Sequence, residues 1–209
     1  MAKKKRRLPE ASPLSQNKQA IMRISGGTSK GIPLQIPKGN RVRPASEPSR
    51  ERLFSSLGDL VQGAIFLDLF AGTGSYGLEA ISRGAASGTF VEKDHGAVKC
   101  LRNNLASVCK SACLSLEAFE IAKGDVLSWK SRQTLCFDLV FVDPPYPSLE
   151  EMIPKLFAKL LREQSVNEDT LVALELPGEM NLQPEGWHLH RRLGKIRKGS
   201  PSHGLFKIA

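Results

Sequence analysis

A carboxylate, two prolines and a tyrosine directly follow an apolar run in the second half of the chain. The run Leu139–Val142 is typical of a buried parallel strand, and Pro144 and Pro145 end it because proline cannot continue a sheet. Ligands of open α/β sheets bind at the carboxyl ends of the strands. Asp143 and Tyr146 are therefore candidate site residues.

A glycine-rich loop lies upstream, with the spacing Gly72-x-Gly74-x-x-Gly77. Glycine lets the backbone turn tightly and lets a ligand approach where a Cβ would collide. Glu92 stands 20 residues beyond Gly72, at the end of the next apolar run, where a carboxylate can accept hydrogen bonds from both hydroxyls of a ribose. Taken alone, this signature fits a nicotinamide dinucleotide as well as S-adenosylmethionine.

Two further aspartates favour S-adenosylmethionine. Asp68 lies at the junction between a strand and the glycine loop, where its charge would repel a pyrophosphate but suits a ligand with an ammonium and a sulfonium group. Asp125 follows a third predicted strand, and its carboxylate can accept a hydrogen bond from the adenine amino group. An aspartate at such a place also caps turns. Asp125 alone is therefore weak evidence for a ligand site, and the neighbouring motifs strengthen it.

The segment from Asp143 to Tyr146 could activate an exocyclic amine for methyl transfer. Such an amine is a poor nucleophile because its lone pair is spread into the ring of the base. If the Asp143 carboxylate and the Pro144 carbonyl accept its hydrogen bonds, they favour the pyramidal amine and its growing positive charge. Pro145 helps to fix this geometry, and Tyr146 offers a face for an unstacked base. The transfer needs positioning more than covalent help, so we assign no general base.

Alternating strands and helices must position these groups. Strands are predicted at 65–70, 88–92, 119–122, 137–142 and 170–176, and helices at 75–83, 94–108 and 149–162. Pro154 would begin or kink the last helix. The segments 187–193 and 205–208 could form a terminal hairpin. The pattern predicts an α/β fold: a doubly wound, mostly parallel sheet with an antiparallel C-terminal hairpin.

Three parts of the chain are expected. Residues 1–21 are basic and then rich in Pro, Ser and Gln, which predicts a disordered extension. Residues 22–62 read as short strands around glycine turns followed by a helix that starts near Ser46, forming a small β-hairpin and helix appendage. Residues 63–209 form the main domain.

The formal net charge of +9 is concentrated at the two ends of the chain. Residues 1–23 hold seven lysines and arginines against one acid, and residues 191–209 hold six with no acid. Basic side chains gain affinity for a polyanion by releasing its counterions. We therefore expect a nucleic-acid partner and C-terminal contacts from Arg191, Arg192, Arg197 and Lys198. For residues 1–20, a solvated tail is an equally good interpretation.

The four cysteines predict neither a disulfide framework nor a metal site, because they lack paired CxxC spacing. No run approaches 18 uninterrupted apolar residues, and no apolar secretion signal follows the basic start. A reducing, cytoplasmic compartment is expected, although the basic N-terminus is also compatible with organelle targeting.

Taken together, the motifs resemble the RsmD family. The resemblance runs from about Arg23 to the C-terminus and includes residues 23–27, 43–44, 49–54, 68–74, 77–80, 82–85 and 143–146. It implies a Rossmann-like class I methyltransferase fold and transfer of a methyl group from S-adenosylmethionine to the exocyclic N2 of a guanine in 16S ribosomal RNA. We also expect a monomer.

The resemblance also implies roles for individual residues. The cofactor would be held by Asp68, Phe70, Gly72, Gly74, Glu92, Asp125 and Val126, and the guanine by Asp143, Pro144, Pro145 and Tyr146. Arg23, Arg43 and Arg50 would face RNA or shape the cofactor pocket. Two departures bear on the shape of that pocket and on the N-terminal contacts. Ala45-Ser46-Glu47 stands where the family often has Thr-Ser-Asp, and Ser75-Tyr76 stands where it commonly has Ala-Leu.

Three alternatives remain open at this point. An adenine-N6 DNA methyltransferase would use the same clamp, but only about 45 residues outside the sheet domain and tail are left to read a sequence and flip a base. A glutamine methyltransferase acting on protein would have Asn-Pro-Pro-Tyr in place of the segment that starts at Asp143. A non-catalytic RNA-binding module would account for the basic ends but not for the clamp.

Overall fold

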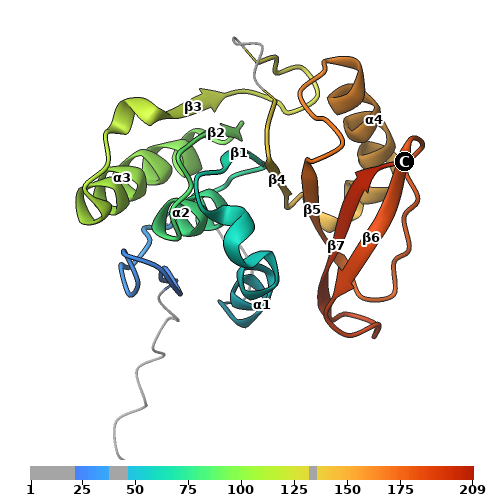
Figure 1. Cartoon of the computed structure of the whole chain (residues 1–209), viewed down its shortest axis with the longest axis horizontal. Helices are drawn as coiled ribbons and strands as arrows, with labels where there is room; N and C mark the ends of the chain where they lie inside the picture. Colours follow the sequence, from blue (N-terminus) through green and yellow to red (C-terminus); the bar gives the residue numbers. More distant parts are fainter. Residues whose placement is uncertain (1–21, 38–46, 132–135) are drawn as a thin grey trace, which may run out of the picture.

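The computed structural model describes residues 22–37, 47–131 and 136–209, which form one seven-stranded sheet flanked by helices (Figure 1). The strands are β1 (Ile65–Leu69), β2 (Ser87–Glu92), β3 (Phe119–Lys123), β4 (Leu139–Val142), β5 (Leu171–Pro177), β6 (Trp187–Leu193) and β7 (Pro201–Ile208). The α-helices are α1 (Glu47–Leu57), α2 (Ser75–Ser82), α3 (His95–Ala112) and α4 (Leu149–Arg162), and the 3-10 turns are η1 (Gly58–Val61), η2 (Leu116–Ala118) and η3 (Tyr146–Ser148).

The strand order places a ligand crevice beside β1. The order is β3-β2-β1-β4-β5-β7-β6, and strands β1 to β5 are parallel. Because β1 pairs with both β2 and β4, the winding of the chain reverses at this point, where α/β sheets bind ligands. Strand β7 runs antiparallel between β5 and β6, so the predicted C-terminal hairpin is confirmed.

Two buried clusters cover the two faces of the sheet. Phe66 of β1 belongs to the cluster that contains side chains of α1, α2 and α3, whereas its neighbour Leu67 belongs to the cluster that contains side chains of α4. This alternation follows from the two-residue period of a strand. Pro154 lies inside α4 rather than at its start. No helix among the described residues is long and apolar enough to cross a bilayer.

The N-terminal segment 22–37 is less regular than predicted. It makes one isolated antiparallel bridge between Arg23 and Pro33, supported by hydrogen bonds from Ile24 N to Ile32 O (3.0 Å) and from Leu34 N to Met22 O (2.8 Å). Ile24 and Leu34 lie in the same buried cluster as Phe66 of the main sheet. The division into an appendage and a main domain stays a prediction, and the predicted start of the following helix at Ser46 lies outside the described residues.

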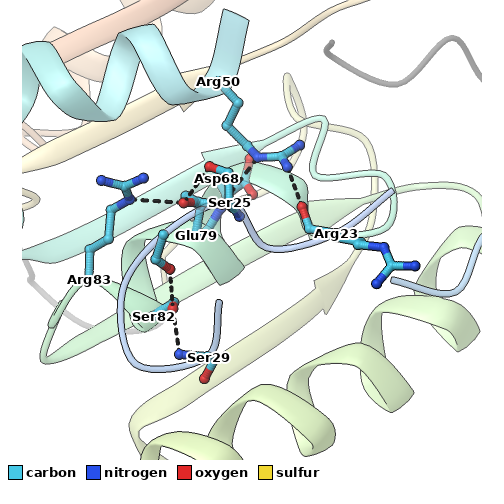
Figure 2. A network of polar contacts seen from close by, with 10 residues as sticks. Arg23, Ser25, Ser29, Arg50, Asp68, Glu79, Ser82 and Arg83 are labelled. Atoms are coloured by element: carbon cyan, nitrogen blue, oxygen red, sulfur yellow. Dashed lines mark hydrogen bonds and ion pairs between the residues drawn. The ribbon is translucent and has the colours of Figure 1, made fainter. Parts of the chain in front are cut away.

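A buried ion-pair network holds this segment against α2 (Figure 2). Glu79 of α2 is fully buried and accepts hydrogen bonds from Ser25 N (2.8 Å), Ser25 Oγ (2.8 Å), Arg50 Nε (3.2 Å) and Arg83 Nε (2.8 Å). Arg50 also donates from Nη2 to the carbonyl of Arg23. The expectation that Arg50 contacts RNA is wrong, because its side chain is 0% exposed and joins three segments of the fold.

Candidate active site

A cavity of about 670 Å³ opens at the carboxyl ends of the parallel strands. Gly72, Glu92 and Asp125 line one part of it, and Asp143 and Tyr146 line another. The volume is in the range of small-ligand and cofactor sites. The glycine turn and the segment after β4 therefore lie on the same side of the sheet, within one cavity.

The turn after β1 has the backbone conformation that its glycine suggests. Gly72 has φ of 56°, and its N–H donates to Glu92 Oε2 at 2.8 Å. Phe70, also on the cavity wall, has φ of 61°, which is unusual for a residue with a large side chain. Such conformations persist where the surrounding structure enforces them and occur often at ligand sites. The chain is thus bent so that backbone, rather than side chain, faces the cavity at Gly72.

Gly74 does not line the cavity, so the structure does not support the predicted direct contact with the cofactor. It precedes α2 with φ of 90°, and a Cβ there would collide with the side chains of Leu101 and Leu78. Gly74 therefore shapes the loop and permits close packing of α2 against α3.

Asp68 lies beneath the glycine loop and likewise does not line the cavity. Its side chain is 1% exposed, its Oδ2 accepts from Gly77 N at 2.9 Å, and its Oδ1 has no hydrogen-bond partner. The pKa of this carboxyl is raised to about 7, chiefly by burial; the Gly77 hydrogen bond opposes this rise and the charge of Glu92 adds to it. Asp68 thus affects the site indirectly. It holds the first turn of α2 through Gly77, and its charge raises the pKa of Asp143.

Two carboxylates on the cavity wall suit an adenosine group. Glu92 ends β2, and its Oε1 accepts from Asp94 N at 2.7 Å. Asp125 follows β3, and its Oδ1 accepts from Leu127 N at 2.9 Å. A carboxylate has about four acceptor positions, so both groups keep capacity for ligand hydroxyls or amines. With Val126 packed beside them on the wall, these residues fit S-adenosylmethionine.

Asp143 stands at the end of β4 and is partly exposed to the cavity. Its pKa is raised well above the usual aspartate range, first by burial among protein atoms, then by the charges of Glu175 and Asp68. The turn after it is held by hydrogen bonds from Ser148 N (3.2 Å) and Ser148 Oγ (3.0 Å) to Pro145 O. Tyr146 is 39% exposed and lines the cavity.

Glu175 of β5 is a cavity residue that motif-based reasoning missed. It accepts hydrogen bonds from Tyr76 Oη at 2.5 Å and from Tyr146 Oη at 3.1 Å. A signal was present in the sequence, namely a single acid in the apolar run Leu171–Pro177 close to the strand's carboxyl end. Its meaning depends on strand register, which places Glu175 next to Asp143 because Val142 pairs with Leu174.

The basic residues differ in their accessibility. Arg23, Arg191, Arg197 and Lys198 are exposed, and Arg43 lies outside the described residues. Arg192 instead donates to Met180 O (2.7 Å), Pro177 O (3.0 Å), Gly178 O (3.0 Å) and Ser202 Oγ (3.0 Å). Its guanidinium holds the base of the β6–β7 loop together. The side chain is half-buried, and its contact with RNA stays a prediction. Within the described ranges, no group of three or more His, Cys, Asp or Glu side chains could hold a metal ion.

Comparisons with known proteins agree with this geometry. A sequence model of the family described as "Conserved hypothetical protein 95" matches residues 22–198. Ribosomal RNA small subunit methyltransferase D of Escherichia coli (strain K12) is 34% identical over 175 residues, which span 81% of this chain and 83% of that protein.

Solved structures of methyltransferases have the same fold as this chain. The Escherichia coli protein yhhF superposes with a TM-score of 0.74 and 28% identity over 90% of this chain and 98% of its own. An RNA methyltransferase from Salinibacter ruber, in complex with S-adenosyl-L-homocysteine, shares the fold with a TM-score of 0.56 and 20% identity, over 79% of this chain and 93% of its own. The fold is that of class I S-adenosylmethionine-dependent methyltransferases, and the chain belongs to the RsmD family.

Proposed function

We propose that this protein transfers a methyl group from S-adenosylmethionine to the exocyclic N2 of a guanine in 16S ribosomal RNA of the small subunit. One observation carries the proposal. A single cavity joins the Gly72 turn, Glu92 and Asp125 to Asp143 and Tyr146. A cofactor and a flipped base could therefore meet within it. The name of the Escherichia coli relative supports ribosomal RNA as the substrate.

The first part of the cavity would hold the cofactor. Glu92 would accept hydrogen bonds from the ribose hydroxyls, Asp125 from the adenine amine, and Val126 would pack against the adenine ring. The positive φ of Gly72 brings backbone to the cavity surface. When bound, S-adenosylmethionine supplies an electrophilic methyl group.

The second part would hold the base. The Asp143 carboxylate and the Pro144 carbonyl would accept hydrogen bonds from the exocyclic amine, while the Tyr146 ring supports the face of the base. The amine would lose one proton as its nitrogen bonds to the methyl carbon and the bond from that carbon to the sulfonium sulfur breaks, which leaves a neutral thioether. The sequence alone predicts no general base, but the raised pKa of Asp143 makes it a stronger base than an ordinary aspartate, so we extend the proposal and let Asp143 receive that proton.

The β6–β7 loop would carry part of the RNA contact. Gly199 and Pro201 line the cavity, so the loop lies at its rim, and its side chains Lys195, Arg197 and Lys198 are exposed. Basic groups at the rim of a site attract a phosphate backbone and orient it. We further propose that the protein acts as a monomer in a reducing compartment such as the cytoplasm.

The test is incubation of the purified protein with methyl-labelled S-adenosylmethionine and three substrates: small subunits lacking the modification, duplex DNA, and ribosomal proteins. Nucleoside and amino-acid analysis then identifies the labelled product. We expect N2-methylguanosine in the RNA. N6-methyladenine in DNA, methylglutamine in protein, or RNA binding without any transfer would each overturn the proposal.

A further inference from the structure

A continuous chain of polar contacts lies beneath the base-binding part of the cavity. Tyr146 donates to Glu175 Oε1 at 3.1 Å, Tyr76 donates to Glu175 Oε2 at 2.5 Å, and Tyr76 Oη lies 2.9 Å from His203 Nε2. These residues come from η3, β5, α2 and β7, so the chain links four elements. None of Glu175, Tyr76 and His203 has a role in the proposed transfer as described above.

The proton positions in this chain follow from the donors available. A carboxylate can only accept, so both tyrosine hydroxyl protons point to Glu175. Tyr76 Oη has then used its proton and must accept from His203, which requires the neutral Nε2–H tautomer. Burial lowers the pKa of His203 to about 4 and raises that of Tyr76 well above its usual value, so both groups keep these states at neutral pH.

The inner members of the chain are tightly enclosed. Tyr76 is 3% exposed, Glu175 6% and His203 1%, whereas Tyr146 faces the cavity. His203 lies directly opposite Glu175 in the β5–β7 pairing, and the Tyr76 ring stacks on Phe141 at a centroid distance of 5.8 Å. Glu175 also lines the cavity, but Tyr146 is the most exposed member of the chain. Rigid surroundings of this kind can fix the direction of the Tyr146 ring.

We propose that Glu175 is a positioning residue for the target base, which holds the Tyr146 ring through its hydroxyl and is itself held by Tyr76 and His203. The inference rests on the proposed function. A base that stacks on a fixed ring keeps its amine within reach of Asp143, and small losses of such alignment reduce rates strongly. Tyr76 stands where the family commonly has leucine. Its hydrogen bond to Glu175 is therefore a feature of this chain rather than of the family pattern.

The same placement gives Glu175 an electrostatic influence on Asp143. The charged and titratable groups that act on this part of the site are Asp68, Tyr76, Asp143, Tyr146, Glu175, His203, Arg50 and Arg52. After the effect of burial, the charge of Glu175 is the largest influence on the pKa of Asp143, and this charge raises the pKa. Neutralising Glu175 should therefore lower the pKa of Asp143, which a purely structural role in the core would not explain.

The first test uses Glu175→Gln and Tyr76→Phe, with the exposed Glu151→Gln of α4 as matched control. We expect kcat on small subunits to fall about tenfold in both site variants, with the Kd for S-adenosylmethionine unchanged. In Glu175→Gln, the acid limb of the pH–rate profile should also move to lower pH. Unchanged kcat and an unchanged limb in an active protein would overturn the inference.

The second test does not depend on activity. The chain has only two tyrosines, so 3-fluorotyrosine labelling gives two ¹⁹F resonances, which Tyr146→Phe assigns. Glu175→Gln should shift the Tyr146 resonance toward that of free fluorotyrosine, and Glu151→Gln should not. An unshifted resonance would show that Glu175 does not hold Tyr146. If the wild type transfers no methyl to RNA but the resonance shifts, the proposed function fails while the contact itself stands.

Discussion

Asp143 combines two properties that the chemistry of an exocyclic amine requires. It lies on the cavity wall, where an amine can reach it, and its surroundings make it a stronger proton acceptor than an ordinary aspartate. The residues at the other part of the cavity have a different task, which is to bind the adenosine group. Mutations in the first set should therefore affect methyl transfer, and mutations in the second set should affect cofactor binding.

Asp143→Ala should abolish methyl transfer while leaving the Kd for S-adenosylmethionine nearly unchanged, because Glu92 and Asp125 remain in place. Titration calorimetry and a transfer assay on small subunits measure the two quantities. In the wild type, activity needs the ionised form of Asp143, so it should fall on acidification at a pH well above the ~3.9 of an ordinary aspartate. Equal loss of binding and transfer in Asp143→Ala would contradict this division.

Asp68→Asn tests the buried carboxyl beneath the glycine loop. Its folded-state pKa of about 7 lies above the value of 3.8 expected on unfolding, so it stabilises the fold below pH 4 and this contribution is lost as pH rises through 7. Between pH 4 and pH 8, the free energy of unfolding of the wild type should therefore fall by up to about 4 kcal/mol relative to that of Asp68→Asn. Urea denaturation at several pH values measures this difference, and a constant difference would refute the assignment.

At the scale of elements, two basic groups that appear similar in sequence have different tasks. Arg50 joins α1, α2 and the N-terminal segment through Glu79 (Figure 2). The β6–β7 loop instead presents Arg197 and Lys198 to solvent at the cavity rim. The first group should govern stability and the second should govern RNA binding.

Arg50→Ala should lower the free energy of unfolding by roughly 3–5 kcal/mol, because it removes one partner of a buried ion pair and leaves Glu79 less well compensated. Arg52→Ala, an exposed change on the same helix, should alter it by less than about 0.5 kcal/mol. Urea denaturation measures both variants. Equal effects would show that the buried network does not secure the N-terminal segment.

Neutralising Arg191, Arg197 and Lys198 together should weaken RNA binding and flatten its salt dependence. The slope of log K against log salt should fall by about 0.7–0.9 for each phosphate contact that is lost. Fluorescence anisotropy with a labelled RNA fragment at several salt concentrations measures the slope. An unchanged slope would remove the C-terminal region from the RNA surface.

At the scale of the whole molecule, sequence reasoning recovered the sheet and several of the residues that line the cavity. Gly72, Glu92, Asp125 and Asp143 each lie at or just after the carboxyl end of a parallel strand, so parallel winding alone brings them to one edge of the sheet. The terminal hairpin was also correct, although the insertion of β7 between β5 and β6 depends on pairing that no local pattern shows.

Other features depend on tertiary context. A basic residue looks the same in sequence whether the fold buries it, as at Arg50, or exposes it, as at Arg197. Glu175 acquires its meaning only through register with Asp143 and through Tyr76, which arrives from a distant helix. The segment 22–37 pairs too briefly to form strands because its side chains are held by α2 and the core instead.

The central claim is that one cavity brings an electrophilic methyl group to a guanine amine held by Asp143. It is tested most directly by mass spectrometry of 16S ribosomal RNA from cells that lack the gene and carry either the wild-type protein or Asp143→Ala. We predict one N2-methylguanosine that is present with the wild type and absent with the variant. The same modification in both, or in neither, would contradict the account.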